Sequence, residues 1–135
     1  MIDLHQHILA VVSLPAISVA AVSRALNAPL RKLDENPYWE FYHCGRHGVF
    51  EQVHFNLSRD KPDWLLAWDY APAQAPLEED LNLAPYGALQ KLDLAPRIPP
   101  EGVETQEYAY GGLQLFIQFT TRSRRLYGAA LHHKS

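Results

Sequence analysis

Two histidines near the start of the chain, His5 and His7, have a spacing that could serve a metal ion. On a strand, side chains two residues apart point to the same face, and two imidazoles on one face can share zinc. Residues 1–12 are equally compatible with a strand and with a helix. The further His and Asp ligands that would complete such a site do not follow at regular intervals. We therefore predict no metal and no cofactor.

The segment His43-Cys44-Gly45-Arg46-His47 is the second candidate for chemistry. A thiolate beside an imidazole could act as a nucleophile, and the same three side chains could hold a metal. On a strand, however, His43 and Cys44 point to opposite faces. The chain also has no phosphate-binding glycine loop, no nucleophile elbow and no paired-cysteine motif. We predict a structural cysteine beside a polar hairpin tip, and a protein that is not an enzyme.

The charges of the chain are unevenly distributed. The net charge is −3, which argues against a nucleic-acid partner. Residues 60–107 contain ten acids and three bases, whereas residues 108–135 contain four bases and no acid. This acidic block could attract a basic partner. The alternative is that its carboxylates are scattered over a solvated surface.

An aromatic strand lies inside the acidic block, at residues 63–70. Trp64, Trp68 and Tyr70 alternate with smaller and acidic residues, so they share one face. Exposed Trp and Tyr dominate protein interfaces, whereas buried ones would belong to the core. Both interpretations remain open, and the acids beside them remain candidates in either case. The predicted partner-binding residues are Asp60, Asp63, Trp64, Asp69, Tyr70, Glu78, Glu79 and Asp80.

The elements that must position these residues follow from periodicity and turn residues. A helix is predicted to begin near Pro15, with a buried stripe of Val19, Val22 and Leu26, and to end at Asn27. A short helix is predicted near residues 77–81. Alternating segments predict strands at 38–43, 49–57, 64–70, 108–110, 113–119 and 126–131. The predicted fold class is α+β, an antiparallel sheet of about six strands with one or two helices on one face.

An internal repeat runs through this pattern. LRKLD at residues 30–34 returns as LQKLD at 89–93, and in each case an acidic-aromatic segment and two strand-like runs follow. A repeat of this length predicts two similar halves within one sheet. We therefore interpret residues 1–135 as a single domain with an internal repeat of 14–70 and 77–133, built as two pseudo-symmetric helix–βββ halves.

The cellular location is inferred from one apolar run and one cysteine. Residues 8–22 are apolar, but this run is shorter than the roughly 20 residues of a membrane helix, and Pro15 interrupts it. No basic residue precedes the run, unlike in a secretory signal. Cys44 has no partner for an internal disulfide. We predict a cytoplasmic protein without a membrane partner.

In size, mild acidity and lack of a catalytic motif, the chain resembles small bacterial immunity proteins, which neutralise toxins of the contact-dependent and type VI secretion kind. The similar segments are PYWEFY at 37–42, DLNLAPYG at 80–87 and YAYGGLQL at 108–115. The resemblance implies an inhibitor that occludes the active or functional surface of a cognate toxin or effector protein. It transfers no site residue, and it leaves the oligomeric state open.

Two alternatives to this function remain. The first is a secretion chaperone for an effector, since such chaperones also tend to be small, acidic and α+β. The second is a metal-dependent hydrolase that uses His5 and His7, because the His-Gln-His segment resembles the opening of amidohydrolase and PHP-type hydrolases. Those families need a barrel of about 200 residues or more, which exceeds this chain.

Overall fold

Two short helices precede all the strands in the computed structural model, which describes residues 3–92 and 102–135. The helices are α1 (Leu4–Val12) and α2 (Val19–Leu26). The strands are β1 (Arg31–Glu35), β2 (Trp39–Cys44), β3 (Phe50–Ser58), β4 (Trp64–Tyr70), β5 (Gly87–Leu92), β6 (Val103–Tyr110), β7 (Leu113–Thr120) and β8 (Leu126–His133). Two 3₁₀ turns, η1 (Pro72–Gln74) and η2 (Glu78–Asp80), lie between β4 and β5.

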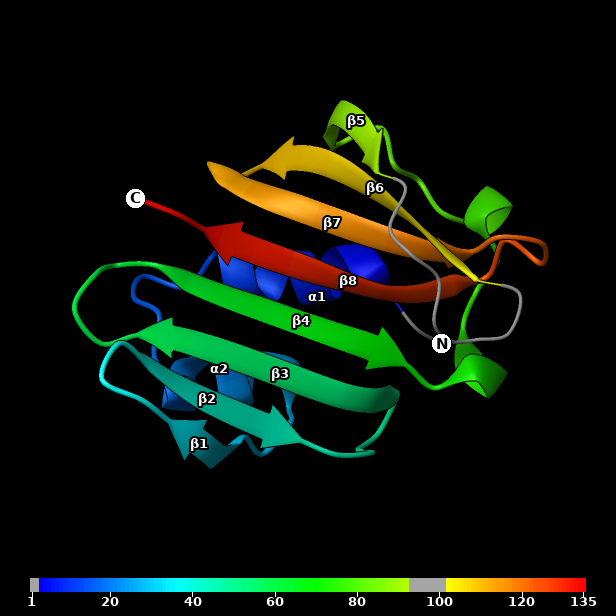
Figure 1. The fold of residues 1–135 in the computed structure, drawn as a ribbon. Helices are drawn as coiled ribbons and strands as arrows, with labels where there is room; N and C mark the ends of the chain where they lie inside the picture. The colour runs from blue at the N-terminus through cyan, green and yellow to red at the C-terminus, as the bar shows by residue number, and fades with distance from the viewer. Residues whose placement is uncertain (1–2, 93–101) are drawn as a thin grey trace.

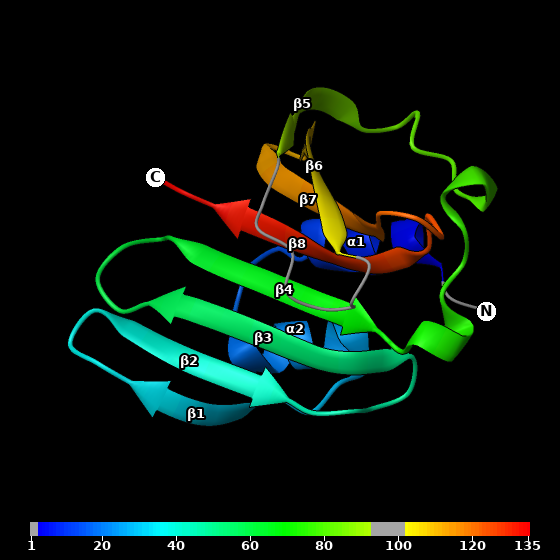
Figure 2. The same cartoon turned by 45° about the vertical axis from the view of Figure 1, so that its right-hand side comes forward.

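The strands form one antiparallel sheet in the order β1-β2-β3-β4-β8-β7-β6-β5. Each half of the sheet is a four-stranded meander, and the pairing of β4 with β8 joins the two halves. Both helices lie on one face, α1 behind β8 and α2 behind β3, and no α-helix of the described residues lies on the opposite face (Figures 1 and 2). The predicted α+β class is confirmed, with eight described strands rather than about six.

The core lies between the helices and the central strands. In β4 the side chains alternate strictly between buried and half-buried positions. Those of the buried series face the helices, because His7 of α1 contacts Phe50, Trp68 and Tyr70. Leu131 of β8 and Leu115 of β7, both fully buried, continue this layer across the sheet. The alternation of side chains predicted from the sequence of β4 is therefore the alternation of buried and half-buried side chains in the structure.

The helix boundaries differ from the predicted ones because side chains cap them. Asp3 accepts a hydrogen bond from the Gln6 N–H, so residues 4–12 form a helix rather than a strand. The second helix begins at Val19 instead of near Pro15, because the Ser18 side chain caps the Ala21 N–H. It ends as predicted at Asn27, which adopts the left-handed conformation with φ 51°.

The two copies of the sequence repeat occupy corresponding strands. LRKLD overlaps the edge strand β1, and residues 89–92 of its counterpart lie in the opposite edge strand β5. Sequence periodicity missed both strands. β1 is exposed along its whole length and has a bulge between Lys32 and Asp34, so no apolar alternation marks it. The predicted helix of the second half is only the single turn η2, which places both α-helices in the first half.

A bulge in β3 changes which side chains at the start of the strand are buried. The sequence pattern places Val49, Glu51 and Val53 on one face, with Phe50 on the other. In the structure the register shifts between Phe50 and Gln52, and Phe50 is 2% exposed. The extra residue turns the start of the strand, so that Phe50 joins Val53 in the core while Glu51 stays exposed.

Candidate functional site

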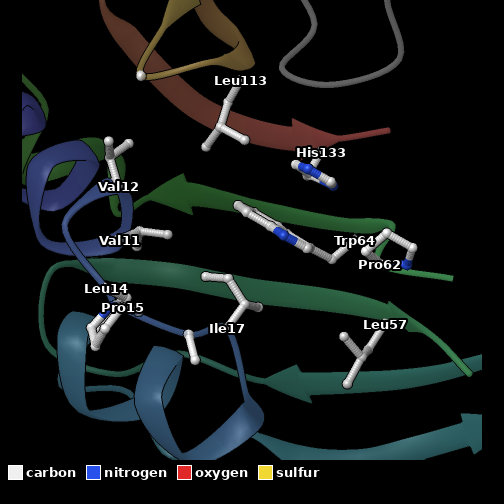
Figure 3. Close-up of a pocket in the computed structure, with 12 residues that line it drawn as sticks. Val11, Val12, Leu14, Pro15, Ile17, Leu57, Pro62, Trp64, Leu113 and His133 are labelled. Carbon is white, nitrogen blue, oxygen red and sulfur yellow. The ribbon is translucent and has the colours of Figure 1, made fainter. Parts of the chain in front are cut away.

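An apolar cleft opens between the helices and one end of the sheet (Figure 3). Its volume is about 410 Å³. It is lined by Val11, Val12, Leu14, Pro15, Ala16, Ile17, Leu57, Pro62, Trp64, Gly111, Leu113 and His133. Trp64, the first residue of β4, is only 5% exposed, and its ring lies in the middle of these residues in Figure 3. The cleft thus has an aromatic centre and mostly aliphatic walls.

Contact between α1 and the β6–β7 hairpin closes one wall of the cleft. Gly111 and Gly112 form the turn of this hairpin, and both glycines have positive φ. A Cβ atom at Gly111 would lie 2.5 Å from Cγ1 of Val12, at the end of α1. Only glycine allows both this backbone conformation and this approach of the hairpin to the helix.

His133 brings an imidazole into the lining of the cleft. Its ring stacks on the Trp64 ring, with a centroid separation of 6.3 Å and an interplanar angle of 10°. Its Nδ1 atom is buried and has no hydrogen-bond partner in the part of the chain that the structure describes. The predicted strand ended at residue 131, whereas β8 continues through His133 and pairs it with Trp64.

Two of the predicted acids stand beside the cleft, on the turn between β3 and β4. Asp63 accepts a 2.6 Å hydrogen bond from the Ser135 backbone N–H, and this bond holds the pKa of its carboxyl below the ordinary value. Asp60 is exposed and accepts a hydrogen bond from the Ser58 hydroxyl. Lys61 lies between them, so this rim carries two carboxylates and one ammonium group.

The other predicted acids lie elsewhere. β4 has seven residues, which separates its two ends by roughly 20 Å. Beyond its far end, Glu78 forms a two-pronged ion pair with Arg124 at 3.1 Å, while Glu79 and Asp80 are exposed. The eight predicted residues therefore do not share one surface: Asp60, Asp63 and Trp64 meet at the cleft, and Glu78, Glu79 and Asp80 lie at the other end.

Tyr70 belongs to the core instead of an exposed aromatic surface. It is 2% exposed, and its hydroxyl lies 2.7 Å from Nδ1 of His7. Burial raises the pKa of Tyr70 and lowers that of His7, although Asp3 partly offsets the effect on His7. Of the two interpretations of the aromatic strand, the structure selects the core.

The side chains of His5 and His7 point in different directions and contact different tyrosines. On α1, His7 contacts Tyr70, whereas His5 Nδ1 lies 2.9 Å from the hydroxyl of Tyr86. The shared direction that a strand would have given them is absent, because residues two apart on a helix point to different sides. Within residues 3–92 and 102–135, no group of three His, Cys, Asp or Glu side chains is arranged to hold a metal.

The remaining predicted acid, Asp69 of β4, lies on the face of the sheet opposite to the described helices. Burial raises its pKa, and Gln52 of β3 donates a 2.5 Å hydrogen bond to its carboxylate. His54 Nε2 in turn lies 3.0 Å from the Gln52 carbonyl oxygen. Across the sheet, the Asp69 carboxylate lies over Gly128, where a side chain would meet it. Asp69 is thus held in a polar network and is less available than its sequence position suggests.

Cys44 is a buried residue at the end of β2. The thiol is 8% exposed and donates to the Gly45 carbonyl oxygen, and strand alternation places it on the face opposite to His43.

No helix of the described residues is long and apolar enough to cross a bilayer.

No family model, curated protein or solved structure matches this chain. A functional proposal therefore depends on the geometry of its own residues.

Proposed function

We propose that this chain is an immunity protein, which binds a cognate bacterial toxin in the cytoplasm and occludes its active or functional surface. The observation that carries the proposal is the apolar cleft around Trp64. The strongest contacts of a protein interface form where a partner's side chain fills a desolvated apolar pocket, and the surrounding rim excludes water. The cleft offers such a pocket on the surface of the fold.

The residues around the cleft indicate what would occupy it. The inner lining accepts an apolar side chain, because it is built mainly from Leu, Ile, Val and Trp side chains. Asp60 and Asp63 on the rim favour a partner with a basic group beside that apolar anchor. Exposed rim charges act mostly on the rate of association, so high salt should slow binding. Asp60→Lys should likewise reduce the association rate while leaving the dissociation rate nearly unchanged.

The function is tested by co-expression with the toxin-like gene that such a pair places immediately upstream. We expect the chain to restore growth of cells that produce this toxin, and to form a stable one-to-one complex with it on gel filtration. A neighbouring toxin that is neither bound nor neutralised would contradict the immunity function.

The cleft is tested by filling its mouth without disturbing the core. Ala16 is exposed and lines the cleft, so Ala16→Trp should block it and abolish protection. Ala73 is also exposed but lies in η1, beyond the far end of β4, so Ala73→Trp should protect like the unmodified chain. Full protection by Ala16→Trp would show that the toxin binds elsewhere.

A further inference from the structure

A second cleft lies at the corner of the sheet where β1 begins and β2 ends. Its volume is about 340 Å³, within the range of small-molecule sites. The lining comes from the start of β1 and from the β2–β3 hairpin, which places Arg31 and Lys32 opposite Arg46 and His47. This cleft is remote from the apolar one, and the two share no lining residue.

The side chains of this cleft are cationic, although the chain as a whole is acidic. Arg31, Lys32 and Arg46 line it together with two imidazoles, and the lining contains no carboxylate. Lys32 pairs with Glu35 and Glu40, so the positive potential of the hollow comes mainly from Arg31 and Arg46, against a net charge of −3 for the whole chain. A positive potential in this cleft favours the binding of a negatively charged ligand.

The two arginines of the cleft are less engaged by carboxylates than Lys32 is. Lys32 lies between Glu35 at 3.3 Å and Glu40 at 3.6 Å. Arg46 reaches only Glu51, at 3.8 Å, and both of these side chains are 48% exposed or more. Exposed pairs of this kind contribute little and exchange readily. Arg31 makes no ion pair among the residues that the structure describes. Its guanidinium retains its full set of donors for a ligand.

His43 adds a positioned donor beside Arg31. The two residues are direct partners across β1 and β2, so their side chains share one face of the sheet. The His43 ring packs on His54 of β3 at a centroid distance of 4.7 Å, which restrains its orientation. A guanidinium donates in a planar fork that matches two oxygens of a phosphate, and an imidazole can donate to a third.

We propose that this cleft is a binding site for a phosphate-bearing ligand, with Arg31 as its principal anchor. The site is independent of toxin binding, because it involves different residues at a different corner of the sheet. Carboxylates offer related acceptor chemistry, so the test must separate the two kinds of anion.

The experiment titrates the isolated chain with sodium pyrophosphate by calorimetry, with NaCl added to keep the ionic strength constant. We expect saturable binding by the unmodified chain. Arg31→Gln should lower the affinity for pyrophosphate by a factor of about ten or more, because charge-assisted hydrogen bonds are lost. The control is Arg59→Gln, which removes another exposed cation, one that pairs with Glu35 and Glu40 near the other end of β2. It should bind within about twofold of the unmodified chain.

Three results would overturn the proposal. They are no saturable heat with pyrophosphate, equal weakening by Arg31→Gln and Arg59→Gln, or citrate binding as tightly as pyrophosphate. Since Arg31 is exposed, Arg31→Gln should keep the thermal unfolding profile of the unmodified chain. Equal melting temperatures would confirm that a loss of binding reflects the site rather than the fold.

Discussion

Gly128 is required where the two halves of the sheet join, and Gly128→Ala tests that requirement. Gly128 pairs with Asp69 on β4 and with Gln118 on β7. An added Cβ would lie less than 3.0 Å from the Trp68 backbone carbonyl oxygen and 2.8 Å from Asp69 Oδ1. The carbonyl belongs to the neighbouring strand and cannot rotate away, so β4 and β8 must separate locally.

The expected cost of Gly128→Ala combines two opposing contributions. Forcing a methyl group into a packed site costs about 1–3 kcal/mol, whereas replacing glycine lowers the entropy of the unfolded chain and returns about 0.4–1 kcal/mol. The net loss should be about 1–2 kcal/mol. With a urea dependence of about 2 kcal/mol per molar, the unfolding midpoint should fall by roughly 0.5–1 M.

The matched control for this experiment is Gly45→Ala. Nothing lies within 4 Å of a Cβ at Gly45, and Gly45 is not among the glycines with positive φ. Its midpoint should stay unchanged or rise slightly. Urea unfolding followed by tryptophan fluorescence compares the two variants. Equal midpoints for Gly45→Ala and Gly128→Ala would refute the claim that the close β4–β8 approach excludes a side chain.

Two further predictions concern partly buried polar groups. Burial lowers the pKa of His7 below its ordinary 6.5, so its contribution to stability is full above pH 6.5 and is lost as the pH falls toward the folded pKa. The free energy of unfolding should therefore decrease from pH 7.5 to 5.5, less steeply in His7→Gln, and parallel slopes would contradict this origin. Arg124→Gln should cost about 1 kcal/mol, since Arg124 joins Glu78 to Glu104 at 2.9–3.1 Å, whereas Arg46→Gln should cost less than about 0.5 kcal/mol. Similar urea midpoints for these two variants would show that the network contributes nothing.

Much of the sheet could be predicted because its signals are local. The alternation in residues 64–70 predicts β4, and the Gly111-Gly112 pair predicts the hairpin between β6 and β7. The β1 strand escaped prediction, because an exposed edge strand buries no face and so leaves no apolar period. Phe50 was assigned to the wrong face for a related reason: a single bulge residue reverses the alternation, and the sequence carries no mark of it.

The candidate site depends on contacts that no local pattern encodes. Trp64 and Asp63 could be selected from the sequence, but Leu14, Gly111 and His133 are 47 to 69 residues from Trp64 along the chain. Only the packing of α1 against the β6–β7 hairpin and the pairing of β4 with β8 bring them around one cleft. His133 carried no sequence signal beyond its residue type.

By itself, the sequence determined the fold class and most strand positions, because periodicity and turn chemistry act over a few residues. The tertiary structure alone decided that the acidic block is divided between two ends of β4, and that Trp64 and Tyr70 are buried. A strand seven residues long carries its ends roughly 20 Å apart, so acids that are close in the sequence serve different surfaces.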